Sequence, residues 1–220
     1  MGERVIQDYL EHSSKTLERK HIYEDVCVTP STLMSKEGFV KVAALCGIVG
    51  VVVVYPLILL AISYYPGFSW FDNALSDLGV QGLSAIIFNT TLISGGILLF
   101  IFSIGLMSHI AGFTAKVGCI LLLASAIFLA LIGLFPENYG RLHFYVSVAF
   151  FVLIVLSLLA LGLHLLLKSS KLSGLLTLAG ALAAALIWLL PWRGVAIPEA
   201  ISSLILSARV LAFAVKMLVR

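Results

Sequence analysis

The sequence predicts an all-α membrane protein: a polytopic bundle of six transmembrane helices preceded by a short N-terminal cytoplasmic helix. The 220-residue chain is 61% hydrophobic and only 11% charged, whereas about a quarter of the residues in a soluble domain are charged. The apolar residues also come in long continuous runs, without the alternation of a membrane-barrel strand. Only helices and closed barrels satisfy their backbone hydrogen bonds in lipid, so these runs are predicted to be helices.

Residues 1–38 form the first predicted domain, a cytoplasmic amphipathic tail. They hold seven of the eleven acidic residues and five of the fourteen Lys and Arg residues. Apolar residues recur there at helical spacing: Val5, Ile6, Tyr9, Leu10 and Leu17. The tail is expected either to lie solvated near the membrane surface or to dock on a protein partner. No apolar run follows Met1, so no signal peptide is expected.

Residues 39–220 form the second predicted domain and contain six apolar segments, each close to the ~20 residues that a hydrocarbon core requires. The predicted spans are 39–64, 84–107, 113–135, 142–167, 172–191 and 196–217. Turn-forming residues such as Pro66, Gly112 and Gly140 separate neighbouring spans. Arg209 lies inside the sixth span, where its long side chain is expected to reach the interface.

The basic residues predict the orientation of these spans. Eleven lie on the side that the two termini share: Arg4, Lys15, Arg19, Lys20, Lys36, Lys41, Lys116, Lys168, Lys171, Lys216 and Arg220. Only Arg141 and Arg193 lie on the opposite side. Cytoplasmic loops carry an excess of Lys and Arg, so both termini are expected in the cytoplasm of a cell-membrane protein. The net charge of +3 is spread over the loops, and no nucleic-acid partner is expected.

The acidic residues beyond the tail gather on the predicted outward side, where three connections meet. They are Asp72, Asp77, Glu137 and Glu199. The same connections carry Arg141, His143 and Arg193. Seven ionisable residues on one face of a charge-poor protein predict a site for a lipid headgroup, a divalent cation or a hydrolytic reaction.

The chemistry of each side chain gives it a candidate role. The candidate ligands of a headgroup or divalent cation are Asp77, Glu137, His143 and Glu199, with His143 also a candidate general base. Arg141 and Arg193 are candidates for gripping a phosphate or headgroup, with Asp72 and Ser76 in support. Purely structural interpretations also exist: Ser76 or Asp77 as a helix cap, Glu199 beside a helix N-terminus, Glu137 paired with Arg141, and His143 bonded to a loop carbonyl.

Three motifs in this order resemble a prokaryotic six-helix membrane family catalogued as domain of unknown function 998. They are Asn-Ala-Leu-Ser-Asp-Leu-Gly at 73–79 with Phe88-Asn89, Gly-Leu-Phe-Pro-Glu at 133–137 with His143, and Ala-Ile-Pro-Glu at 196–199. The resemblance covers about residues 40–218. It implies the six-helix architecture and marks Asp77, Glu137, His143 and Glu199, but it implies no activity. More distantly, the first loop and the Pro-Glu turn are similar to the Frag1/DRAM/Sfk1 group, implicated in lipid and membrane trafficking.

Two functional hypotheses follow. In the first, the outward cluster of an integral membrane protein binds a membrane lipid headgroup or a divalent cation, with hydrolytic or transferase chemistry as its catalytic version. In the second, the chain is an accessory or structural subunit of a larger complex, docked through residues 1–38 and its Gly-rich helix faces. A small-molecule transporter is least favoured, because no acidic residue occupies a midplane position.

Overall fold

The computed structural model describes residues 35–219, and this part of the chain is helical with no strand. Its long helices are α2 (Lys36–Ser63), α3 (Gly82–His109), α4 (Phe113–Leu134), α5 (Arg141–Lys168), α6 (Lys171–Leu186) and α7 (Ala196–Val219). All six are long and apolar enough to cross a membrane, α6 together with the short helix η3 (Ile187–Leu189) that extends it. The prediction of an all-α six-span bundle is confirmed. The predicted tail helix lies outside the described residues.

Two boundaries differ from the predicted spans by three residues or more. Helix α2 begins at Lys36 rather than at residue 39, because Lys36 and Glu37 continue the helix although they are not apolar. The α-helical part of the fifth span ends at Leu186, and a 3-10 turn carries it to Leu189. Pro191 follows shortly afterwards, and the residue before a proline is disfavoured in the helical conformation.

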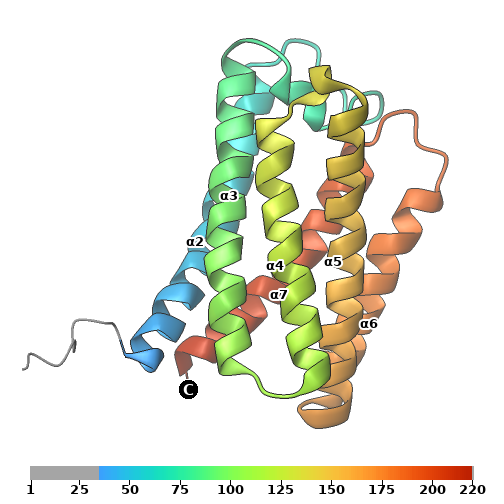
Figure 1. The fold of residues 1–220 in the computed structure, drawn as a ribbon. Coiled ribbons are helices and arrows are strands. Elements are labelled where there is room, and N and C mark those ends of the chain that lie inside the picture. The colour runs from blue at the N-terminus through green and yellow to red at the C-terminus, as the bar shows by residue number, and fades with distance from the viewer. Residues whose placement is uncertain (1–34, 220) are drawn as a thin grey trace, which may run out of the picture. The chain divides into compact units, whose positions relative to one another are not determined.

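The helices form an antiparallel bundle (Figure 1). Helices α3, α4 and α5 stand side by side, α6 packs against α5, and α7 runs obliquely behind them. The start of α2 and the end of α7 lie at the same end of the bundle. Toward the other end, α6 diverges from α5.

Small residues let the central helices approach closely. A Cβ atom at Gly96 of α3 would lie only 2.7 Å from the carbonyl oxygen of Ala126 and 2.8 Å from the backbone nitrogen of Ala130, both in α4. A larger side chain there would separate the two helices. Such small-residue contacts are how helices associate in lipid, where burial of apolar surface gives no driving force.

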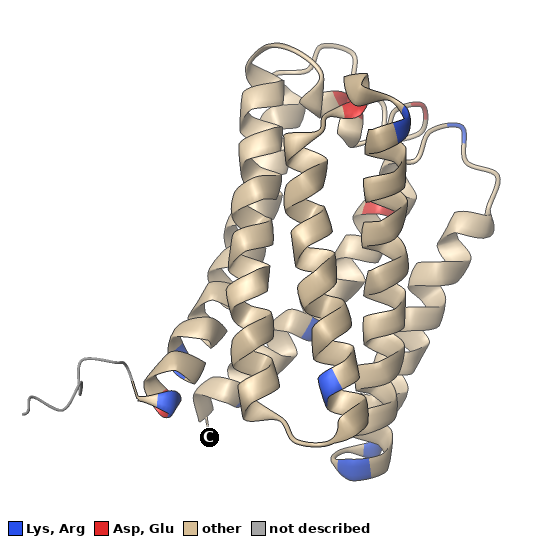
Figure 2. Cartoon of the chain, in the orientation of Figure 1, with Lys and Arg blue, Asp and Glu red and all other residues tan. Residues whose placement is uncertain are grey.

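Most charged residues lie toward the two ends of the bundle, and Arg209 lies within α7 (Figure 2). The acidic end carries Asp72, Asp77, Glu137 and Glu199, together with Arg141 and Arg193. The basic end carries Lys41, Lys116, Lys168, Lys171 and Lys216. Long apolar flanks between two charged ends are expected of a multi-pass membrane protein. That the basic end faces the cytoplasm stays a prediction.

Candidate functional site

The acidic end is built on the connection between α2 and α3. The Asp77 carboxylate oxygen Oδ2 accepts hydrogen bonds from the Asn73 side-chain amide at 2.7 Å and from the backbone N–H of Ala74 at 3.0 Å. The Asn73 amide oxygen in turn accepts from the backbone N–H of Ser69 at 2.9 Å. These bonds fix the turn that leads into the short 3-10 helix η1 (Ser76–Gly79). Asp77 therefore fixes the turn before η1; the interpretation of Asp77 as a helix cap is wrong, because Leu75 occupies the N-cap and no side chain caps η1.

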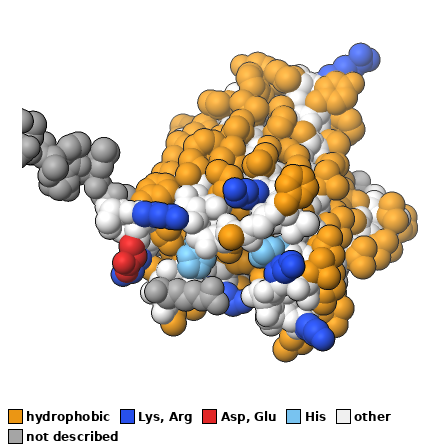
Figure 3. Space-filling view, turned by 60° about the horizontal axis from the view of Figure 1, so that its bottom comes forward, with side chains coloured by type: hydrophobic (Ala, Val, Ile, Leu, Met, Phe, Trp, Pro, Cys, Tyr) orange, Lys and Arg blue, Asp and Glu red, His pale blue; other side chains and the backbone are white. Residues whose placement is uncertain are grey.

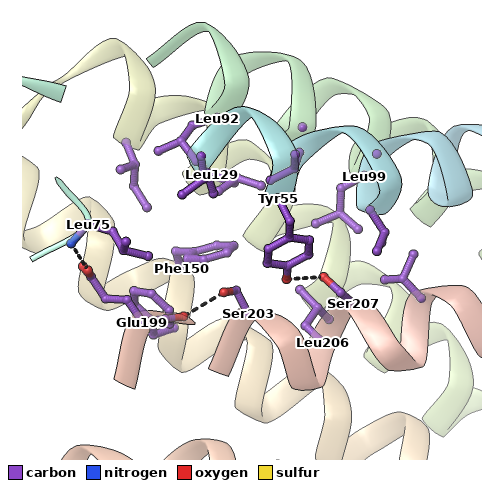
Figure 4. A pocket seen from close by; sticks show the side chains of 18 of the residues that line it. Tyr55, Leu75, Leu92, Leu99, Leu129, Phe150, Glu199, Ser203, Leu206 and Ser207 are labelled. Carbon is purple, nitrogen blue, oxygen red and sulfur yellow. Dashed lines mark hydrogen bonds between the residues drawn. The ribbon is translucent and has the colours of Figure 1, made fainter. Parts of the chain in front are cut away.

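Glu199 ties the first turn of α7 to the same connection. Its oxygen Oε2 accepts a hydrogen bond of 2.6 Å from the backbone N–H of Leu75, and the Glu199 side chain is buried (Figure 4). A buried N–H group without a partner would cost free energy, so this contact joins two segments that lie far apart in the chain. The charges of Asp77 and Glu137 both act on Glu199, so the structure brings these three predicted carboxylates together.

A glycine allows the connection before α7 to lie against the connection after α2. The Gly194 N–H donates to the Phe71 carbonyl oxygen at 2.8 Å, and the Ala196 N–H donates to the Asn73 carbonyl oxygen at 3.0 Å. A Cβ atom at Gly194 would lie 2.5 Å from the backbone nitrogen of Asn73. Backbone cannot move aside as a flexible side chain can, so this approach requires glycine.

Glu137 belongs to the short helix η2 (Glu137–Tyr139) that precedes α5. Burial raises the pKa of its carboxyl group to about 7; hydrogen bonding to Asp77 and the negative charge of Asp77 add to this shift, while the Ser76 hydroxyl opposes it. Among residues 35–219, the buried oxygen Oε2 of Glu137 has no hydrogen-bond partner. The site therefore holds a buried oxygen that still lacks a hydrogen-bond partner.

His143 is held in one orientation by the loop before it. Its Nδ1–H donates to the carbonyl oxygen of Phe135 at 2.7 Å, because a carbonyl can only accept. Nε2 is left as an acceptor and faces the Ser147 hydroxyl at 3.3 Å. The bond to a loop carbonyl was one of the two interpretations of His143. Sequence reasoning missed Ser147, although its position one turn after His143 places both on one helix face.

The two arginines lie on the outside of this assembly. Arg193 approaches Asp72 with 3.8 Å between Nη1 and Oδ1, and 86% and 58% of the two side chains are exposed. Arg141 is the exposed first residue of α5. The expected ion pair between Glu137 and Arg141 is not formed within the described residues. The exposed Arg193–Asp72 pair is of a kind that contributes little to stability.

The geometry lends no support to the divalent-cation hypothesis. Nowhere between residues 35 and 219 do three or more His, Cys, Asp or Glu side chains lie so that they could hold a metal ion. The oxygens Oδ2 of Asp77 and Oε2 of Glu199 already accept hydrogen bonds from N–H groups. These two carboxylates are thus each held by hydrogen bonds from the chain itself.

Two cavities meet at this cluster. The inner chamber, of about 120 Å³, lies between α2, α3, α4, α5 and α7 (Figure 4) and is crossed by a 2.7 Å hydrogen bond between the hydroxyls of Tyr55 and Ser207. The lateral groove, of about 710 Å³, lies between α5, α6, η3 and the start of α7. Four residues line both cavities: Ser76, Ser147, Phe151 and Glu199.

The lateral groove is apolar along its length and polar at one end. Its walls are formed by Val148, Val152, Val155 and Leu156 of α5 and by Ala184, Ala185 and Trp188 of α6 and η3. Its polar end carries Glu137, His143 and Glu199, and its described lining residues include no Lys or Arg. Val148 is 43% exposed and Val152 50% exposed, so the groove opens on the flank of the bundle. A concave apolar wall with a few converging polar groups is the usual form of a small-molecule site.

The chain belongs to a known protein family. Residues 48–216 match the sequence model of the family described as Protein of unknown function (DUF998), which confirms the resemblance seen in the three motifs. The more distant likeness to the Frag1/DRAM/Sfk1 group stays a prediction. Comparison with curated proteins and with solved structures found no match.

Proposed function

We propose that this membrane protein of the DUF998 family binds a membrane amphiphile, with its chain in the lateral groove and its polar head at Glu137, His143 and Glu199. The observation that supports this proposal is the continuity of the groove. One wall is open to the lipid-facing flank, and the far end reaches the buried Glu199 and the half-buried Glu137. A soluble ligand would have no need of an apolar approach from the lipid side.

The length of the groove suits one acyl chain. Its lining residues on α5 extend from His143 to Leu156. These thirteen residue steps correspond to roughly 20 Å along a helix axis, against a hydrocarbon core of ~30 Å for the whole bilayer. A chain that fills the groove with its head at the acidic end would therefore reach the middle of the bilayer.

The chemistry of the polar end favours a head that donates hydrogen bonds. Glu137 presents a buried oxygen without a hydrogen-bond partner, and Nε2 of a neutral His143 is an acceptor. No described Lys or Arg lines the groove, and Arg141 and Arg193 lie exposed outside it. An amine or hydroxyl head supplies the missing donors, whereas a phosphate head would face carboxylates without a cation to balance it.

A groove-filling substitution tests the proposal. The full-length chain, purified in mild detergent, is titrated with a long-chain alkyl amine, alcohol and phosphate of equal chain length, and binding is followed by native mass spectrometry. Val152→Trp places an indole in the groove and should weaken amine and alcohol binding by about tenfold or more. The matched control is Val52→Trp, because Val52 is 60% exposed on α2 and lines neither cavity.

The control variant should bind as the wild type does. Equal binding by Val152→Trp and the wild type would show that the amphiphile does not bind in the groove. Preference for the alkyl phosphate over the amine would instead overturn the proposed head chemistry. Nothing in the described residues specifically favours the accessory-subunit hypothesis, whose docking tail lies almost wholly outside them.

A further inference from the structure

Arg209 is a charged residue inside a membrane-spanning helix. It lies in α7, ten residues before Val219, which corresponds to roughly 15 Å along the helix axis. Arginines inside transmembrane helices are rare and usually have a partner that accounts for them. The partners of Arg209 therefore indicate what this part of the protein binds.

The protein itself satisfies Arg209 only in part. Its Nη2 donates to the Ser173 hydroxyl at 2.9 Å, and its guanidinium carbon lies 5.8 Å from the ring centroid of Phe213. Its Nε is buried without a hydrogen-bond partner, and no carboxylate between residues 35 and 219 forms an ion pair with it. A guanidinium carries five N–H donors, so most of them remain available to another molecule.

The surroundings of Arg209 favour an anion. Ser173 is the third residue of α6, and the Ser170 hydroxyl caps this helix by accepting from the Ser173 N–H. The positive end of the α6 dipole therefore points toward the same region. The nearby end of the bundle gathers Lys, Arg and His side chains (Figure 3). Asp72, Asp77, Glu137 and Glu199 lie at the opposite end.

We propose that Arg209 and Ser173 bind the phosphate group of an anionic phospholipid, between α7 and the first turn of α6. Guanidinium groups pair with phosphate through parallel charge-assisted hydrogen bonds. Ser173 lies two residues after Lys171, in the first turn of α6, so this phosphate would lie at the basic end of the bundle, where a lipid of that leaflet supplies it. This site is separate from the lateral groove and does not depend on the function proposed for that groove.

Native mass spectrometry of the full-length chain with phosphatidylglycerol tests this site. Arg209→Gln should weaken phosphatidylglycerol binding by about tenfold, the loss expected for one hydrogen bond to a charged partner. Arg209→Lys should retain part of the affinity, and Ser173→Ala should lose a smaller part. The matched control is Lys216→Gln, which removes one charge from the same helix nearer its end and should change the affinity less than Arg209→Gln does.

The source of the phosphate is tested in the same titration. Phosphatidylcholine, whose head carries no net charge, should bind more weakly than phosphatidylglycerol. Inorganic phosphate should not displace the lipid, and displacement would overturn the lipid as its source. Unchanged phosphatidylglycerol affinity in both Arg209→Gln and Ser173→Ala would overturn the site. An equal loss in Lys216→Gln would also overturn it, because the effect would then come from overall charge.

Discussion

The acidic and basic ends of this bundle are built in different ways. At the acidic end, the connection after α2 is joined to the connection before α7 and to the start of α7 by hydrogen bonds, such as those from Gly194 to Phe71 and from Leu75 to Glu199, and its helix η1 also contacts η2. At the basic end, short turns at residues 110–112 and 169–170 join neighbouring helices. The acidic end thus has the connected polar network that a defined site requires. The Lys residues of the basic end need only mark the membrane surface.

Among substitutions that disturb the contacts at the acidic end, the largest loss of stability is expected at Gly194. Gly194→Ala places a Cβ atom against the backbone of Asn73 and Asp72 and should destabilise the protein by about 3 kcal/mol, the upper range for overpacking. Thermal unfolding in detergent measures the change. Gly50→Ala is the control, because a Cβ there meets Leu98 at an ordinary 3.4 Å. Equal stability of both variants would contradict the close contact between the two connections.

Glu199 should show the next largest effect. Glu199→Ala leaves the buried N–H of Leu75 without its acceptor and should cost about 2 kcal/mol. Glu199→Gln keeps a carbonyl acceptor and should cost less. Unfolding measurements together with hydrogen exchange at the Leu75 amide separate the two variants. Protection of that amide in Glu199→Ala as strong as in the wild type would refute the contact.

A smaller loss is expected at Asp77. Asp77→Ala removes the acceptor of the Asn73 amide and of the Ala74 N–H, both of which are only partly buried, so the cost should be about 1 kcal/mol. Asp77→Asn keeps an acceptor oxygen and should stay closer to the wild type. The same unfolding assay applies. A loss in Asp77→Ala larger than in Glu199→Ala would reverse the importance assigned to the two carboxylates.

Glu137 predicts a dependence of stability on pH. The pKa of Glu137 is raised to about 7 in the folded protein from an ordinary 4.5, so the folded state keeps a proton that the unfolded chain has lost between these values. Its contribution to stability is therefore fully present below pH 4.5 and is lost as pH rises through about 7. The difference in unfolding free energy between wild type and Glu137→Gln, measured across this range, should follow that course. A constant difference would contradict the raised pKa.

Substitutions at the basic end should have the smallest effect on stability. Lys168→Gln and Lys171→Gln change exposed or half-exposed residues beside the α5–α6 turn, and each should shift the unfolding free energy by less than about 0.5 kcal/mol. The assay is the thermal unfolding used for the acidic end. A loss as large as that of Glu199→Ala would show that the two ends do not differ in the way described.

The spans could be predicted because hydropathy is a local property. Residues such as Val52 and Leu59 face outward and are apolar, so each span can be recognised from its own sequence without knowledge of its neighbours. The predicted end of the fifth span was less accurate, because Pro191 disfavours a helical conformation in the residue before it.

The candidate site was predictable in composition but not in geometry. The Leu75–Glu199 contact joins residues 124 positions apart, which no local pattern contains. Ser147 was missed because a hydroxyl in an apolar helix is unremarkable until His143 is seen facing it. The exposure of Arg141 and Arg193 depends on how the connections fold. The same folding keeps both arginines out of the groove lining.

The most direct test of the amphiphile site is to map where a lipid chain lies. A long-chain alkyl amine with a photoreactive group on its chain is added to the reconstituted full-length protein, crosslinked by light and located by peptide mass spectrometry. The proposed function predicts adducts concentrated on the groove residues Val148, Val152 and Ala185, and their loss in Val152→Trp. Labelling of Val49 and Val52 on α2 at the same yield, unaffected by that substitution, would contradict it.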